Sequence, residues 1–521
     1  MFVNIVQFNM ANVTVTVEWL NNKIDRLNII NDEIEKKDEL DLIELKLKSL
    51  TTLELDNAAS NIDLGRLFSH ITSISPDDRQ IIDRFCGILN VLFAALSPNE
   101  IFQQYSSELI QHLSHHDSAV KKLVLSQFVR MAEEKHPQLL TNVDLLNKII
   151  EKIGDNDIGV AQIAMGIIKK IGSEPNTTNL LYSGLLLRTI AKMVVKNDAA
   201  SFRIYDVIIH IAKSSEQCLQ ASINSGLIDS LINMLDNEDI LLQLNALDAL
   251  GDLAVSDGGL KYIEQRELLS NLDRKISRAS EDPLSNLLIP GLMKFFGNIA
   301  KNHPHNIFTK YPRIIGALFD IIEAADDTVI LMNALDTLGH IASTVEGKYA
   351  LDNLHDAMPS VMRKMKNFIS NMPTEVRLRA LDSLASILHV DQDNHNNRIL
   401  LLTKSWFDLL HDDPVSYIVD FCKQPFIDIR LSSMKVLLEV ATQYWGQEYI
   451  ANHPGLMEFL MNRRVESDSQ CKIIKYEIIK ALTTGDCFDA TIMVRLEQYV
   501  RAGPLAIDID TEVATESGGN A

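Results

Sequence analysis

One ten-residue phrase occurs twice in this chain and constrains its fold more than any other feature. NALDALGDLA (residues 245–254) returns as NALDTLGHIA (residues 333–342), with seven of the ten letters unchanged. On a helix with Ala246 as position zero, the apolar residues at offsets 1, 4, 7 and 8 fall on one face. The phrase therefore indicates the buried face of an amphipathic helix, and its recurrence indicates a repeated unit.

The same helix face can be found nine times along the chain, at intervals of about 40 to 50 residues. Offsets 1, 4 and 7 are apolar in every copy, and offset 8 is Ala or Gly in seven of the nine. A small residue at that offset lets a neighbouring backbone pack closely. Position zero falls at Arg84, Val124, Ala164, Ile204, Ala246, Leu292, Ala334, Ala380 and Ser433.

A shorter apolar helix and a polar turn are expected before each of these helices. LIDSLINMLDNEDILLQLNAL (residues 227–247) and IGALFDIIEAADDTVILMNAL (residues 315–335) share this design. Asp326 and Asp327 fall in such a turn, and Gly154 is the expected helix stop in another copy. Two helices per unit and a period near forty are typical of armadillo and HEAT repeats. The sequence thus predicts an all-α fold, a right-handed armadillo/HEAT-like α-solenoid of about nine to ten helical repeats.

The ends of the chain differ from this array. Residues 1–70 have helical periodicity and many charges, so we expect an N-terminal helical cap, followed by the repeat array over residues 71–480. C-terminal capping helices are expected over residues 481–505. Residues 506–521 are acidic, small and non-periodic, which predicts a disordered tail. Met10 is an alternative to Met1 as the first residue.

Charge and cysteine content limit the classes of partner. The chain has 49 Lys and Arg against 70 Asp and Glu, a net charge of −21, without any long basic run. Such a chain is expected to bind neither nucleic acid nor an anionic membrane. Its five cysteines are odd in number and widely spaced, and no signal peptide or membrane span is evident. We expect a monomeric protein in the reducing cytoplasm, with the nucleus as an alternative, and we expect the cysteines to fill the core.

Sequence motifs of catalysis are absent, so we expect a protein that is not an enzyme and has no catalytic, cofactor or metal site. HLSHHD contains His112, His115 and His116, of which the first and last share one helix face as metal ligands would. The alternative, which we favour, is a helix end and turn between repeat helices. His303 and His305, in NHPH, are expected in a solvated loop.

An acidic row is predicted on the side of the long helices that faces away from the core. Offset 2 holds aspartate in four copies, interrupted by Lys294, and offset 6 is its neighbour. Stacking of the repeats would align these residues into one wall, which is either a solvated face or a docking surface for a basic partner. The residues expected to bind a partner are Asp206, Asp248, Asp252, Lys294, Asp336, His340 and Asp382.

Several longer strings resemble the 26S proteasome non-ATPase regulatory subunit 5 family. They are IPGLMKFFGNIA (289–300), VEGK (345–348), SWFDLLHDDP (405–414), QPF (424–426), HPGLMEFLMNRRVESD (453–468) with KYEIIKAL (475–482), and the earlier HDSAVKKLVLSQFVRM (116–131). Together they cover most of the chain, and the first 80 or so residues resemble the family least.

The resemblance implies an assembly chaperone of the proteasome base. Family members bind a proteasomal AAA ATPase, regulatory subunit 7, at its C-terminal domain, and through it other base subunits. They escort an assembly intermediate and leave before the mature particle forms. The chain ends in SGGNA, which lacks the hydrophobic-Tyr-X tail by which the ATPases dock on the core particle. The rival interpretation is a general armadillo/HEAT scaffold or adaptor for another protein.

Overall fold

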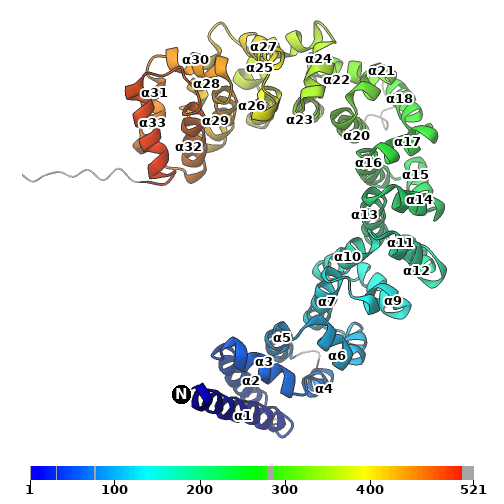
Figure 1. Cartoon of the computed structure of the whole chain (residues 1–521). Helices are drawn as coiled ribbons and strands as arrows, with labels where there is room; N and C mark the ends of the chain where they lie inside the picture. The colour runs from blue at the N-terminus through cyan, green and yellow to red at the C-terminus, as the bar shows by residue number, and fades with distance from the viewer. Residues whose placement is uncertain (1, 31, 76–77, 279–286, 507–521) are drawn as a thin grey trace, which may run out of the picture. The chain divides into compact units, whose positions relative to one another are not determined.

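A computed structural model of the chain describes residues 2–30, 32–75, 78–278 and 287–506 (Figure 1). The structure is 80% helical, contains 32 α-helices, and has no strand among the residues it describes. None of the described helices is long and apolar enough to cross a membrane. The all-α repeat fold predicted from the sequence is thereby confirmed.

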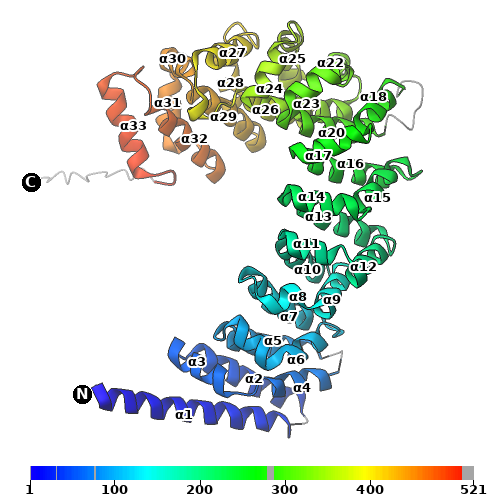
Figure 2. The ribbon, with the colours of Figure 1, turned by 45° about the vertical axis from the view of Figure 1, so that its right-hand side comes forward.

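The chain divides into two compact units, Met1–Ala249 and Leu250–Ala521. Within each unit, long helices follow one another in one row and shorter helices lie beside them, as the two views show (Figures 1 and 2). The boundary between the units falls inside helix α16 (Ile240–Ala254), which carries the first copy of the repeated phrase.

All nine positions taken as position zero lie on long helices, which we call the second helices of the repeats. A tenth second helix, α32, follows them. In the first unit they are α5 (Arg79–Ala94), α7 (Ser118–Glu133), α10 (Ile158–Gly172) and α13 (Asp198–Ser214). After α16, those of the second unit are α20 (Ile289–Asn302), α23 (Thr328–Ala342), α26 (Thr374–Leu388), α29 (Ile427–Ala441) and α32 (Ser469–Leu482).

From α10 onwards a first helix precedes each second helix, and a polar turn joins the two wherever the structure describes the connection. These are α9 (Val143–Ile153), α12 (Gly184–Val194), α15 (Leu227–Asn233) with the 3-10 turn η1 (Met234–Asp236), α18 (Leu268–Arg278), α22 (Pro312–Ala324), α25 (Ala357–Asn371), α28 (Pro414–Cys422) and α31 (Leu456–Met461). The turns start the second helices as expected: the Asp327 carboxylate accepts the backbone N–H of Val329 at 2.8 Å at the N-cap of α23. Gly154 follows the last residue of α9, where the sequence placed a helix stop.

A short third helix, which the two-helix prediction missed, follows most second helices. These helices are α8 (Pro137–Thr141), α11 (Pro175–Leu181), α14 (Glu216–Asn224), α17 (Asp257–Gln265), α21 (Pro304–Lys310), α24 (Val345–Asp352), α27 (Asn397–Asp408) and α30 (Tyr444–Asn452). In α6 (Pro98–His112) the third helix of one repeat and the first helix of the next are joined across Tyr105, whose backbone is not helical. The three-helix unit is the armadillo form of the repeat.

Polar side chains on three of the third helices donate hydrogen bonds to carbonyls at the ends of the second helices before them. At the end of α10, the Thr178 hydroxyl donates to the carbonyl of Gly172 at 2.6 Å. At the end of α23, the Lys348 ammonium donates to the carbonyl of Ala342. At the end of α29, the Gln447 side-chain amide donates to the carbonyl of Ala441 at 3.0 Å. In each case a polar side chain six residues further along satisfies a carbonyl at the end of a second helix.

The remaining elements lie at the chain ends and in one connection. The N-terminal helices are α1 (Phe2–Leu27), α2 (Glu33–Lys48), α3 (Thr52–Asn61) and α4 (Gly65–Ser73), and α33 (Ala490–Ala502) is the last helix. The 3-10 turns η3 (Gln392–Asn394) and η4 (Arg463–Val465) lie in the second unit. Of the predicted acidic tail, only residue 506 belongs to the described part of the chain.

The predicted core face is buried with two exceptions. All nine residues at offset 4 and all seven small residues at offset 8 are buried. Met165 at offset 1 and Val91 at offset 7 are only half-buried. All five cysteines are free thiols; four are buried, as expected of core residues, whereas Cys487 is partly exposed.

A glycine at offset 5 brings neighbouring second helices close together in the second unit. A Cβ atom added at Gly339 would lie 3.0 Å from the Cα of Ser383 on α26. One added at Gly297 would lie 2.7 Å from a methyl of Thr337 on α23. The glycine inside the repeated phrase therefore marks the contact between successive repeats.

Candidate partner-binding surface

The seven residues predicted to bind a partner lie on the side of the second helices that faces away from the core. Asp206 is on α13 and Asp248 is on α16, and both are exposed. The other five belong to the second unit: Asp252 on α16, Lys294 on α20, Asp336 and His340 on α23, and Asp382 on α26. Of these five, Asp252, Lys294 and Asp336 are exposed, and His340 and Asp382 are half-buried.

Asp336 and Asp382 are electrostatic neighbours on successive second helices. The pKa of the Asp336 carboxyl is raised, chiefly by burial; Arg379 opposes this effect and Asp382 adds to it. Two neighbouring carboxylates favour the approach of a cation from a partner. This pair is the part of the acidic row that the structure brings together most clearly.

Three of the aspartates already pair with basic residues of the chain, which sequence reasoning missed. Asp206 accepts Lys169 of α10 at 2.8 Å. In the second unit, Arg379 lies 3.3 Å from Asp336. The third pair joins Lys435 of α29 to Asp382, also at 3.3 Å. Each partner lies about one repeat away along the chain, so a basic residue on the neighbouring second helix was the sequence signal for these pairs.

These pairs stabilise the chain only weakly. The side chains of all three aspartates remain 43% to 54% exposed. Exposed ion pairs contribute roughly 0–1 kcal/mol each. A cation from a partner can therefore replace the intramolecular one at little cost.

His340 contributes to this surface as a neutral group. Burial, assisted by Lys301, lowers the pKa of the His340 imidazole below its ordinary value of 6.5. The ring is therefore neutral at pH 7 and can offer a partner both a donor and an acceptor.

One arrangement of Ser, His and Asp in the second unit has the composition of a catalytic triad but not its geometry. The Ser416 hydroxyl lies 2.9 Å from Nε2 of His453 and donates to the Asp413 carboxylate at 2.6 Å. In a triad the carboxylate orients the histidine, whereas here it binds the serine directly and caps α28. The Ser416 hydrogen bonds also lower the pKa of the Asp413 carboxyl. The group is a helix cap.

The histidine-rich stretch HLSHHD lies at the end of α6 and in the turn before α7, as favoured from the sequence. The buried His112 ring contacts the Thr72 hydroxyl at 3.0 Å. The Asp117 carboxylate accepts the N–H of Ala119 at 2.7 Å at the start of α7. Within the described residues, no group of three or more His, Cys, Asp or Glu is arranged to hold a metal ion.

The prediction for NHPH is wrong at its first histidine. The His303 side chain is only 16% exposed, and its Nε2 lies 3.0 Å from the carbonyl of Val255. His303 directly precedes Pro304, which is the first residue of α21. The proline therefore begins a helix here and does not lie in a solvated loop. His305 is exposed, as expected.

The chain matches a family model described as "Proteasome non-ATPase 26S subunit" over residues 16–521. It is 30% identical over 486 residues to a human protein named 26S proteasome non-ATPase regulatory subunit 5, covering 92% of this chain and 96% of that one. The protein of the same name from Drosophila melanogaster is 27% identical over 508 residues, covering 96% of each chain.

Solved structures of importin-β resemble the fold. Yeast importin-β (Kap95p) aligns over 94% of this chain and 65% of its own, with a TM-score of 0.55 and 11% identity. A second importin-β structure aligns over 92% of this chain and 67% of its own, with a TM-score of 0.53 and 12% identity. At such low identity the likeness concerns the helical-repeat fold alone.

Proposed function

The chain belongs to the family of proteasome non-ATPase 26S subunits, and from that premise we propose that it is an assembly chaperone for the base of the 26S regulatory particle. Its partner in this proposal is the C-terminal domain of the AAA ATPase regulatory subunit 7, and through that subunit the other base subunits. The chain binds an assembly intermediate as a monomer and leaves before the mature particle forms. The proposed location is the cytoplasm, with the nucleus as an alternative.

The observation that carries this proposal is the extent of the similarity to subunit 5. It covers nearly the whole length of both chains, so it includes the helices that form the candidate surface. Neither the name of these relatives nor a helical-repeat fold is typical of an enzyme. A repeat fold supplies a long row of helix faces, which suits binding of a protein domain.

The acidic row is the proposed docking surface for a basic face of the ATPase domain. It consists of Asp206, Asp248, Asp252, Lys294, Asp336, His340 and Asp382. Such a surface accelerates encounter with a partner of opposite charge, and its effect weakens with salt. The weak intramolecular pairs at three of these aspartates leave them available for exchange.

The direct test mixes the full chain with the isolated C-terminal domain of regulatory subunit 7 and measures association by stopped-flow fluorescence at low and high salt. We expect a one-to-one complex whose association rate falls as salt rises. Absence of binding would contradict the proposed partner, and a different protein recovered from lysate on the immobilised chain would favour the adaptor interpretation.

The surface is tested separately with the triple variant Asp248→Asn, Asp336→Asn and Asp382→Asn. A matched triple variant, Asp144→Asn, Asp320→Asn and Asp352→Asn, removes the same charge from exposed positions on first and third helices. We expect slower association at low salt for the first variant only, with single substitutions nearly silent. Equal association rates for both variants would contradict the acidic row as the docking surface. They would not contradict regulatory subunit 7 as the partner.

A further inference from the structure

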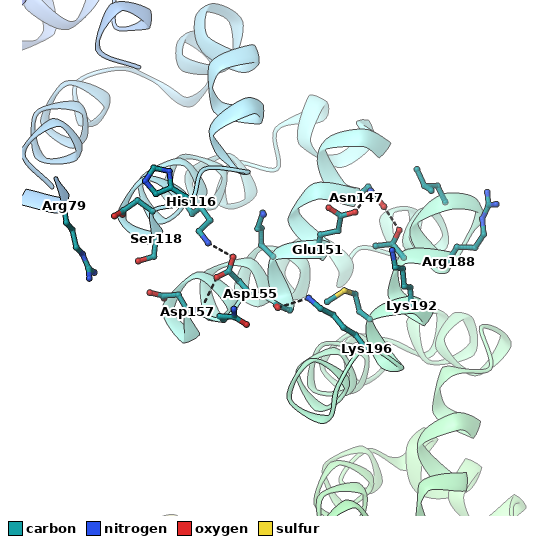
Figure 3. A pocket seen from close by; sticks show the side chains of 18 residues that line it. Arg79, His116, Ser118, Asn147, Glu151, Asp155, Asp157, Arg188, Lys192 and Lys196 are labelled. Carbon is teal, nitrogen blue, oxygen red and sulfur yellow. Dashed lines mark hydrogen bonds and ion pairs between the residues drawn. The ribbon is translucent and has the colours of Figure 1, made fainter. Parts of the chain in front are cut away.

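A groove in the first unit carries the charge opposite to that of the acidic row. It lies among α5, α7, α9, α10 and α12 and has a volume of about 1080 Å³ (Figure 3). Six Lys or Arg residues and four Asp or Glu residues line it. Cations thus outnumber carboxylates in this groove, although the chain as a whole has a net charge of −21.

Three of the four carboxylates in the groove are already occupied. Asp117 caps the start of α7, as described above. Asp155 lies 2.7 Å from the ammonium of the buried Lys121. Asp157 pairs with Lys122 at 2.9 Å and also accepts the N–H of Val160 at the start of α10. Asp117 and Glu151 form no ion pair with a Lys or Arg among the described residues, but Asp117 is held by its helix cap.

The cations of the opposite wall have no such partners. Arg188, Lys192 and Lys196 are exposed, and the described residues place no carboxylate within ion-pair distance of them. Two of them donate to backbone carbonyls instead: Arg188 to Gly184 and Lys196 to Gly154, both at 3.2 Å. Such bonds hold the side chains in place but leave their charge available.

The spacing of these cations matches an extended peptide. Arg188 and Lys192 are four residues apart on α12, a rise of about 6 Å along the helix, and Lys196 continues the row just past the helix end (Figure 3). Alternate residues of an extended chain are about 6.6 Å apart. Carboxylates at every second residue of such a chain therefore meet successive cations.

Two further features favour a peptide over a small anion. The cations form a row, whereas a small anion is bound where donors converge on one point. Leu185, which lines the same wall, is 43% exposed and offers an apolar contact that a small anion cannot use. Lys152, half-buried on α9, adds a further cation to the groove, where Asp155 and Glu151 act on it electrostatically.

We propose that this groove binds an extended acidic segment of a partner protein, with carboxylates at alternate residues facing Arg188, Lys192 and Lys196. This inference goes beyond the proposed function, because it assigns a second binding surface of opposite charge in a different part of the chain. It does not depend on the identity of the ATPase partner.

The test measures fluorescence anisotropy of labelled peptides with the full chain at low salt. One peptide alternates Glu with Ser, a second has the same composition with all Glu at one end, and a third has Gln in place of Glu. The groove variant is Arg188→Gln, Lys192→Gln and Lys196→Gln. The matched control is Lys170→Gln, Lys213→Gln and Lys261→Gln, three exposed lysines outside the groove.

We expect the alternating peptide to bind the parent and the control alike, and to bind the groove variant about tenfold or more weakly, as loss of three exposed charge contacts implies. We also expect it to bind more tightly than the clustered peptide, and the Gln peptide not to bind. Equal affinity for the groove variant and the control, or no binding of any acidic peptide, would overturn the proposal. So would equal affinity for the clustered peptide or full displacement by millimolar inorganic phosphate, which would indicate a general anion site.

Discussion

At the scale of single residues, the least expected feature is a lysine buried completely inside the second unit. Lys348 of α24 donates a hydrogen bond to the carbonyl of Ala342 at the end of α23, where the helix dipole favours a cation. Burial lowers the pKa of its ammonium to about 8, although Glu439 and Asp391 oppose that effect. Gln447 performs the same task without a charge at the end of α29. The charge of Lys348 is therefore not required by the fold.

Lys348→Gln is expected to keep the fold and to change how stability depends on pH. Below pH 8 the buried ammonium of the parent is charged, and this lowers the free energy of unfolding. Between pH 8 and about 10.5 its folded state loses this proton while the unfolded state keeps it, so the free energy of unfolding rises with pH, by roughly 3 kcal/mol at most. Urea denaturation from pH 7.5 to 10 should show that this rise is smaller in the variant. Parallel pH profiles for the two proteins would contradict the assignment.

The centre of the repeated phrase is expected to be sensitive to truncation. Leu250 and Leu338 are completely buried, and Leu401 is 66% exposed. Leu250→Ala and Leu338→Ala should each lower the free energy of unfolding by about 2–5 kcal/mol. Leu401→Ala should change it by no more than about 0.5 kcal/mol. Chemical denaturation of the three variants measures this, and equal stability of all three would mean that the helix register is wrong.

At the scale of helices, the contact between successive second helices depends on the offset-5 glycines. Gly339→Ala would press a methyl group against the backbone of α26 and should destabilise the chain by about 1–3 kcal/mol. Gly316 of α22 is also helical, but nothing lies within 4 Å of the position its Cβ would take. Gly316→Ala should therefore stabilise the chain by about 0.5–1 kcal/mol. Thermal unfolding of the pair decides this, since shifts in the same direction would refute the close contact.

The sequence predicted the second helices well because their buried face repeats at every offset that contacts the core. The third helices were missed because they are short: α11 and α24 have seven and eight residues, too few to show a clear helical period. The tenth second helix, α32, escaped the nine-fold pattern because its offset-1 residue is Lys475, which is 1% exposed and donates to the carbonyl of Asn462 at 2.6 Å. A search for apolar residues cannot find a buried lysine.

The surface was less predictable than the core. The acidic residues fall on the outward side of their helices, as the helical period requires, but their pairing with Lys169, Arg379 and Lys435 depends on how neighbouring repeats stack. The basic groove combines residues from α5 to α12 that share no motif. Local periodicity decides which side of a helix is buried, whereas only the stacked repeats bring such side chains together.

At the scale of the whole molecule, a repeat array is expected to respond to damage locally, because each repeat contacts mainly its neighbours. Hydrogen exchange of the Leu338→Ala variant should show faster exchange in α20, α23 and α26, with α7 and α10 protected as in the parent. Uniformly faster exchange along the chain would instead indicate a single cooperative unit.

The central claim, that the chain assists proteasome assembly and then leaves, is tested most directly by where it resides in a cell lysate. Separation of native complexes by size, followed by quantitative mass spectrometry, gives the ratio of this chain to regulatory subunit 7 in each fraction. We predict that the chain accompanies regulatory subunit 7 in complexes smaller than the 26S particle and is absent from active 26S fractions. An equimolar amount of the chain in active 26S particles would contradict the account.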